Sequence, residues 1–222
     1  MSARSEFLPV APEAEALPRR SNTPGAKLEL LVLAADADHC EGVDLASGAL
    51  VRAWSPAPVD PDLRPYDVVG GTLDDTVDLL PDPSQPEAVP LMEPPERTGR
   101  ITGRRAERYL RALVHPSGQP LLAIHGAAVP FWQRTSDYPS IAVVEPLGPA
   151  VIRLREGALS CMFRWRGVPV ELPCVDRLVS RALVATGRTR MDSNKGERLL
   201  VALEPPVDGH CHKVVQALLP RP

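Results

Sequence analysis

Alternation of apolar and polar positions is clearest in the last third of the chain, where it predicts a β-hairpin. Residues 151–155 and 159–166 both alternate, and Arg166-Gly167 turns the chain into a third alternating run, residues 168–172. The apolar positions of the middle run are Cys161, Phe163 and Trp165, and Arg164 lies between them. Because successive side chains of a strand point to opposite faces, these strands should present one apolar and one cationic face.

Short apolar runs bounded by polar or glycine-containing segments predict further strands. These runs are residues 28–33, 41–45, 49–54, 67–69, 76–80, 121–125, 141–144, 199–203 and 213–219. The runs 41–45 and 49–54 flank a short connection that contains Gly48, which indicates a second hairpin.

Two segments have the periodicity of an amphipathic helix. In residues 102–114 one apolar stripe forms, with an arginine-rich face opposite to it. The stripe consists of Ala106, Tyr109, Leu110 and Leu113, and the arginines are Arg104, Arg105, Arg108 and Arg111. In the second segment, about residues 175–185, we expect Leu178, Val179 and Ala182 to face inward and Gly187 to end the helix.

Proline is frequent, with 26 residues, and this favours many short elements over a helical bundle. Residues 1–26 have no periodic apolar pattern and read as a disordered tail, and residues 81–95 contain six prolines and read as an extended linker. We therefore predict a mainly β fold with one or two short helices. Its parts would be the tail 1–26, a first OB-like β domain 27–80, a Pro-rich linker and helix 81–116, and a second OB-like β domain 117–222, so that two small barrels are joined by the linker and helix.

Length and cysteine content limit the cellular setting. Among the 222 residues no apolar run approaches the ~20 that a membrane helix needs, and residues 1–22 lack the apolar core of a secretory signal, so we expect no membrane partner. The four cysteines form no C-x-x-C pair, which favours free, mostly buried thiols in a reducing cytoplasm. They are Cys40, Cys161, Cys174 and Cys211.

Charge is unevenly distributed along the chain. Residues 1–96 hold 6 Lys and Arg against 18 Asp and Glu, a formal charge of −12, whereas residues 97–222 hold 19 against 10, a formal charge of +9. Such an asymmetry indicates either an anionic partner for the basic part or attraction between the two parts.

The basic residues suggest a nucleic-acid-binding site on the second domain. If the strands 151–155 and 159–166 are neighbours, their arginines share one face, and the polar loop 187–198 adds further cations. The candidate residues are Arg153, Arg155, Arg164, Arg166, Arg188, Arg190, Lys195 and Arg198. Single-stranded or duplex nucleic acid would be held electrostatically, with an affinity that falls as salt rises.

Other interpretations stay open. Aromatic residues make up only 4% of the chain, and Phe163 and Trp165 are expected to face inward, which counts against base stacking. The arginines could instead pair with the acidic part. The leading hypothesis is a non-enzymatic nucleic-acid-binding module. The alternatives are a protein-interaction or scaffold protein with complementary acidic and basic halves, and an accessory component of a nucleic-acid-modifying enzyme.

No catalytic residue, metal site or cofactor is predicted. The chain has no G-x-S-x-G, P-loop or G-x-G-x-x-G motif. The segments 39–40 (HC), 210–212 (HCH) and 74–78 (DDTVD) match no metal-ligand spacing, and Asp176 is explained by its place at the start of a helix.

Three segments resemble the bacterial dual-OB-domain family, whose members are associated with nucleic-acid binding or modification. Residues 48–52 (GALVR) resemble a first-barrel hairpin, and residues 163–176 resemble an aromatic strand, turn and strand that end in an aspartate. Residues 199–219, with the core GHCHKVV at 209–215, resemble the closing pair of strands. The resemblance implies a binding-type fold with two OB domains and implies no defined reaction.

Overall fold

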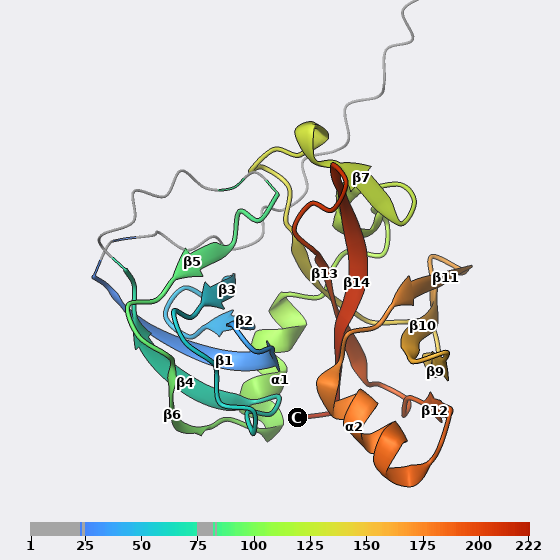
Figure 1. Cartoon of the computed structure of the whole chain (residues 1–222), viewed down its shortest axis with the longest axis horizontal. Helices are drawn as coiled ribbons and strands as arrows, with labels where there is room; N and C mark the ends of the chain where they lie inside the picture. The colour runs from blue at the N-terminus through green and yellow to red at the C-terminus, as the bar shows by residue number, and fades with distance from the viewer. Residues whose placement is uncertain (1–22, 24, 75–81, 83) are drawn as a thin grey trace, which may run out of the picture.

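The computed structural model describes residues 23, 25–74, 82 and 84–222 and is mainly β (Figure 1). The predicted tail 1–26 lies outside the described residues except for 23, 25 and 26, and the predicted strand at 76–80 lies entirely outside them.

The described strands form three sheets, and two α-helices lie among them. The strands before the first helix are β1 (Lys27–Ala35), β2 (His39–Asp44), β3 (Leu50–Trp54), β4 (Asp67–Thr72), β5 (Ala88–Pro90) and β6 (Glu96–Arg100). After helix α1 (Gly103–Ala112) come β7 (Ala128–Pro130), β8 (Ile141–Val144), β9 (Val151–Arg155), β10 (Ala158–Trp165) and β11 (Val168–Pro173). Helix α2 (Arg177–Thr186) precedes β12 (Arg190–Asp192), β13 (Arg198–Leu203) and β14 (His210–Leu219).

The first sheet has the strand order β5-β3-β2-β1-β4-β6 and curls into a half-barrel. Strands β1, β2 and β3 form an antiparallel meander, β4 pairs with β1, and β5 pairs in parallel with β3. A shift of register in β1 between Val32 and Ala34 bends the sheet, as β-bulges do. The two sides of the curl meet where Leu73 bridges Leu91 and Met92 N donates to Thr72 O at 3.0 Å.

The proline-rich segment contains β5, so it differs from the predicted linker, which was not expected to fold. Arg52 N donates to Glu87 O at 3.0 Å, and Leu91 N donates to Trp54 O at 2.8 Å. Val89 and Leu91 are buried in the first sheet's core. Strand β5 tolerates Pro90 because it lies at the edge of the sheet, where a missing N–H breaks no ladder.

The second half contains the predicted hairpin. Strands β9, β10 and β11 pair antiparallel, and their apolar positions Ile152, Cys161 and Phe163 are buried. This confirms the apolar face derived from alternation. The sheet β11-β10-β9-β12 meets the sheet β7-β14-β13-β8 where the chain beyond β11 runs parallel to β14, at a bridge between Cys174 and Val215.

Both predicted helices are present. In α1, Ala106 and Leu110 are buried as expected. Asp176 caps α2 by accepting from Leu178 N and Val179 N, and Gly187 ends the helix with a φ of 63°. Within α2 the buried face differs from the prediction, because Val179 and Leu183 are buried, whereas the predicted Leu178 is half-buried and Ala182 is exposed.

One predicted strand is wrong. Residues 121–125 contain a short 3-10 turn, Leu121–Ala123, with left-handed backbone at Leu122 and Ala123. Leu121, Leu122 and Ile124 are nevertheless buried in the core of the second half. A short apolar run predicts burial well, but a turn can bury it as completely as a strand does.

One hydrophobic cluster belongs to both halves of the chain. Helix α1 lies between the first sheet and β13 and β14 (Figure 1) and contributes to this cluster. The cluster is defined here as the shared core, and its buried members are Leu31, Leu33, Val43, Leu50, Tyr66, Val68, Ile101, Ala106, Leu110, Leu113, Ile141, Val143, Leu200, Ala202, Ala217 and Leu219. The two halves are therefore packed directly against each other.

Candidate nucleic-acid interface

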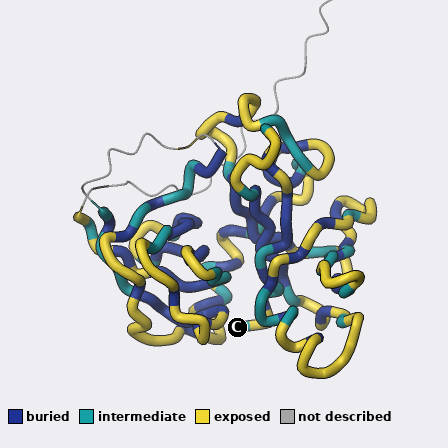
Figure 2. Tube along the Cα trace, viewed as in Figure 1, coloured by how far each residue is buried: buried dark blue, intermediate teal, exposed yellow. Residues whose placement is uncertain are grey.

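The outward face of the sheet β11-β10-β9-β12 carries arginines from three strands. Much of this part of the molecule is exposed or half-buried (Figure 2). From Cys161 to Trp165 buried positions of β10 alternate with more exposed ones, so Arg164 points away from the core. Arg153 lies opposite Ser160 of β10 on one side and opposite Arg190 of β12 on the other. With Arg155 at the end of β9, these residues define the basic face: Arg153, Arg155, Arg164 and Arg190.

Two of these cations are direct cross-strand neighbours. Arg153 and Arg190 occupy paired positions of β9 and β12, and like charges placed so are unfavourable. Arg190 is partly neutralised by Asp192, whose Oδ1 lies 2.9 Å from Nη2. Arg190 and Asp192 are both exposed, so this ion pair is weak. An anion bound across the strands would relieve the repulsion.

Three further candidates lie at the margins of the basic face. Arg166 occupies the turn between β10 and β11 with a φ of 55° beside Gly167, and its side chain is exposed. Arg188 and Lys195 are exposed before and after β12. The structure thus brings seven of the eight predicted residues to the surface of this sheet or its flanking loops.

Arg198 does not belong to this surface, and its assignment as an exposed loop residue is wrong. It begins β13, is 9% exposed, and donates two hydrogen bonds to the Glu107 carboxylate of α1 at 2.7 and 2.8 Å. These bonds raise the pKa of Arg198 and lower that of Glu107. Because the strand starts one residue earlier than the sequence pattern indicated, the side chain faces the helix.

The ion pairs distinguish the candidate arginines from those that neutralise the acidic part. Asp67 is buried and pairs with Arg97 and Arg100 at 3.0 Å each, and Asp36 pairs with Arg177 at 3.4 Å. Within residues 23, 25–74, 82 and 84–96, by contrast, no carboxylate forms an ion pair with any of the eight candidates. The acidic part is partly neutralised from the basic part, but by other arginines.

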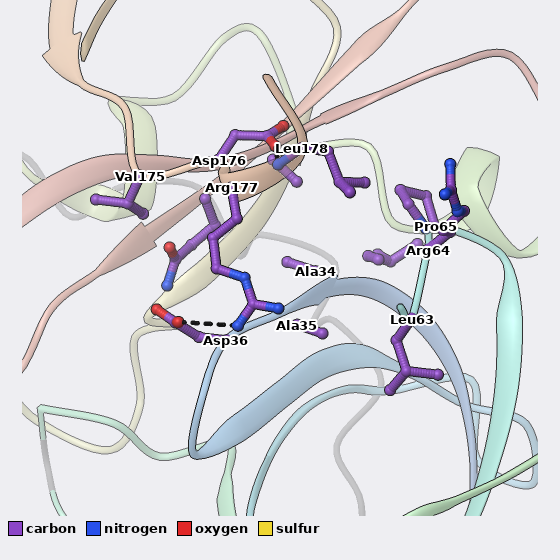
Figure 3. Close-up of a pocket in the computed structure, with 13 residues that line it drawn as sticks. Ala34, Ala35, Asp36, Leu63, Arg64, Pro65, Val175, Asp176, Arg177 and Leu178 are labelled. Carbon is purple, nitrogen blue, oxygen red and sulfur yellow. Dashed lines mark hydrogen bonds and ion pairs between the residues drawn. The ribbon is translucent and has the colours of Figure 1, made fainter. Parts of the chain in front are cut away.

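A small pocket lies between the two halves (Figure 3). The end of β1 and residues 63–65 line one side of it, and the start of α2 together with Gln216 and Ala217 of β14 line the other. Arg177 and Asp36 pair across it. Asp176 lines it, but both of its carboxylate oxygens accept backbone hydrogen bonds, from Leu178 and Val179 at one oxygen and from Leu218 at the other. Burial raises the pKa of Asp176, and these bonds oppose that shift.

A catalytic site built from Arg52, Asp67, Asp176 and His212 would need these side chains to converge in a pocket, and this pocket does not bring them together. Arg52, Asp67 and His212 are not among its lining residues. Arg52 instead bonds the buried Glu41 carboxylate, with 2.7 Å between Nε and Oε1, and donates to Leu203 O. This buried pair joins β2 to β3 and ties β3 to the end of β13, although Glu41 Oε2 has no hydrogen-bond partner.

The cysteines are free and buried, as predicted. Burial raises the pKa of Cys40 and of Cys161 to about 12 and that of Cys174 to about 11, so these thiols stay protonated and unreactive near neutral pH. In the described part of the chain, no three His, Cys, Asp or Glu side chains are grouped so that they could hold a metal ion.

Exposed aromatic residues are the feature that the sequence analysis missed. Trp132 is 65% exposed and Phe131 is 47% exposed, and both lie in a 3-10 turn, Phe131–Gln133, next to β7. The signal was present, because these rings follow a proline in a stretch without apolar periodicity, where a core position is not expected.

No described helix is both long and apolar enough to cross a membrane. Comparisons of this chain with protein-family models, with curated proteins and with solved structures find no match.

Proposed function

We propose that the protein is a non-enzymatic nucleic-acid-binding module and that the basic face holds the phosphate backbone. The observation that carries the proposal is the gathering of Arg153, Arg155, Arg164 and Arg190 on one outward sheet face, away from the first half's carboxylates. Arginine binds phosphate well because its planar guanidinium donates two parallel hydrogen bonds. Strands side by side can offer such donors along the length of a nucleic-acid strand.

The order of strands supports an OB-like second half. Strands β9, β10 and β11 form a meander, α2 follows, and β13 and β14 complete the set. The chain just after β11 runs parallel to β14, and β8 pairs with β13 on the far side. An OB fold is a five-stranded Greek-key barrel that binds oligonucleotides on its sheet face. We take the basic face as the counterpart of that binding surface.

The first half supports the same proposal. It also has a three-stranded meander followed by two strands, with the fifth parallel to the third and with a bridge between the fourth and fifth. Two similar strand orders in one chain agree with the resemblance to the dual-OB-domain family. On this basis we interpret the first half as a supporting barrel, because its acidic residues make it a poor surface for phosphate.

The test is a charge-reversal experiment. The double variant Arg153→Glu/Arg164→Glu should weaken binding of single-stranded and duplex DNA and RNA, measured by fluorescence anisotropy at two salt concentrations. Losing about two phosphate contacts should also reduce the slope of log K against log salt by about 1.4 for single strands. Arg164 is exposed and Arg153 is half-buried on the outward face of the sheet, so we expect folding to be unaffected.

The matched control is Arg105→Glu/Arg108→Glu on α1, which makes the same change in net charge at exposed arginines of another element. It should retain most of the affinity and the full salt slope. Equal loss in both double variants would mean that only net charge matters and would remove the basic face as a site. Absence of binding by the wild-type protein at low salt would overturn the proposed function itself.

A further inference from the structure

Three rings form an exposed cluster at the start of β14. The centroids of Phe131 and Trp132 lie 5.9 Å apart with an interplanar angle of 84°, and those of Trp132 and His210 lie 6.0 Å apart with an angle of 64°. We define Phe131, Trp132 and His210 as the aromatic cluster. Because both contacts are edge-to-face, neither neighbouring ring is stacked flat on the indole of Trp132, which remains largely open to solvent.

The backbone beneath the cluster is fixed. Phe131 N donates to Gly209 O at 3.0 Å, and Pro130 of β7 is paired with His210 of β14. Gly209 has a φ of 78°, and a Cβ there would lie 3.2 Å from the Trp132 ring, so the indole rests directly on this turn. The ring is thus held in place before any ligand arrives, which lowers the entropic cost of binding.

The surroundings favour a small planar ligand over a protein. Most residues that follow the cluster are polar and exposed, namely Gln133, Thr135, Ser136 and Asp137, while Tyr138 and Val207 add two exposed apolar side chains. A specific protein interface usually buries about 800 Å² on each side around an apolar centre, and a few scattered apolar side chains among polar neighbours do not offer that. The exposed imidazoles of His210 and His212 can donate hydrogen bonds to a phosphate next to the ring.

We propose that the aromatic cluster binds an unpaired nucleobase, stacked on Trp132, and so gives the protein a preference for single-stranded over duplex nucleic acid. This inference rests on the proposed function, to which it adds a second contact. Exposed aromatic side chains bind single strands by stacking on any base, whereas in a duplex the base faces are already stacked on one another. Both surfaces belong to the second half, since β14 is joined to the chain after β11 by the Cys174–Val215 bridge.

The experiment compares Trp132→Ala with the wild-type full chain, using fluorescein-labelled oligo(dT), oligo(U) and a duplex of the same length. Trp132→Ala should weaken single-strand binding about tenfold, the loss expected for one stacked base. Duplex affinity and the salt slope should stay unchanged. Trp132→Phe should restore most of the affinity, and oligo(dT) should quench tryptophan fluorescence in the wild type but much less in Trp132→Phe.

The control variant is Val184→Ala on α2, an apolar residue that is 69% exposed and lies outside the cluster. It should bind like the wild type. Equal wild-type affinity for single strands and duplex, together with an unchanged affinity in Trp132→Ala, would overturn the stacking inference while leaving the basic face intact, and would favour a protein partner for the cluster. No binding of any nucleic acid would instead overturn the proposed function.

Discussion

Lys213 is a buried cation without a carboxylate partner in the described structure. It is 4% exposed, and its Nζ donates to Ile124 O at 2.7 Å. Burial lowers the pKa of Lys213 from 10.5 to about 8. The pKa of His115 is lowered by burial and by the charge of Lys213. Lys213 and His115 both contact the turn around Leu122, where the backbone is left-handed.

This burial predicts a specific pH dependence. Because the folded pKa is depressed, the unfolded state binds more protons between about pH 8 and about 10.5, so the contribution of Lys213 to stability rises with pH over that window. Lys213→Met removes the titration. The stability of the wild type relative to this variant should therefore rise by roughly 2–3 kcal/mol between neutral and alkaline pH. Urea unfolding followed by circular dichroism at several pH values measures the difference.

Comparing the two proteins cancels the other buried groups that titrate in the same range, such as Cys40 and Tyr66, whose pKa values are raised by burial. If the two stability curves stay parallel from neutral pH to about pH 10, burial does not lower the pKa of Lys213 in the folded protein and this interpretation is wrong.

At the scale of elements, the curl of the first sheet depends on a glycine. Gly42 of β2 pairs with Val32 of β1, just where the register of β1 shifts. A Cβ at this position would lie 2.2 Å from Leu31 O and 2.9 Å from Leu30 Cγ. The backbones of β1 and β2 therefore lie so close together at position 42 that only glycine, which has no Cβ, fits there.

We expect Gly42→Ala to destabilise the protein by about 3 kcal/mol or more, because the clash is with backbone in the middle of a sheet. Gly99→Ala in β6 is the control, since a Cβ there meets nothing within 4 Å. Thermal unfolding of the two variants measures the contrast. A Gly42→Ala protein as stable as Gly99→Ala would show that β1 and β2 are not this close.

The elements that could be predicted are those whose own sequence contains the whole signal. Strand β10 alternates from Cys161 to Trp165, and α2 has both an aspartate cap and a terminal glycine. Strand β6 gave no signal because all five of its residues are exposed at a sheet edge. Strand β5 was not predicted because prolines surround it in the sequence. In addition, it pairs with β3, a partner more than thirty residues earlier, which no local pattern reveals.

In the candidate site, too, local patterns placed some residues correctly, whereas contacts with distant segments decided the positions of others. Alternation was sufficient to place Arg153 and Arg164 on an outward face. It could not place Arg198, because its burial depends on Glu107 of α1, which is distant in sequence. The lack of apolar periodicity around Trp132 argues against a core position, but it could not show that the ring lies over Gly209, since this depends on how the turn beside β7 packs. Contacts between distant segments are the part that no local pattern contains.

At the scale of the whole molecule, a line of buried polar contacts runs alongside the shared core. Arg52 bonds Glu41 within the first sheet and donates across to Leu203 O at the end of β13. Glu87 accepts from Ser140 N and Oγ at 2.8 and 2.6 Å. A buried charge that loses its partner is costly, so these contacts penalise separation of the halves in addition to the exposure of apolar surface. We infer that the two halves unfold together.

Two tryptophans make this inference testable. Trp54 reports on the first half, where it packs on His39, and Trp165 reports on the second, where it is buried against His115. In a Trp132→Phe background, adding Trp165→Phe or Trp54→Phe leaves one reporter in each protein.

Leu200→Ala, at a fully buried position of the shared core, should lower the free energy of unfolding by about 3 kcal/mol. Because the shared core joins both halves, the urea midpoints reported by Trp54 and by Trp165 should fall by the same amount. A shift seen only by Trp165, or two separate transitions in one protein, would mean that the halves are independent domains and that the acidic and basic parts meet only through surface charge.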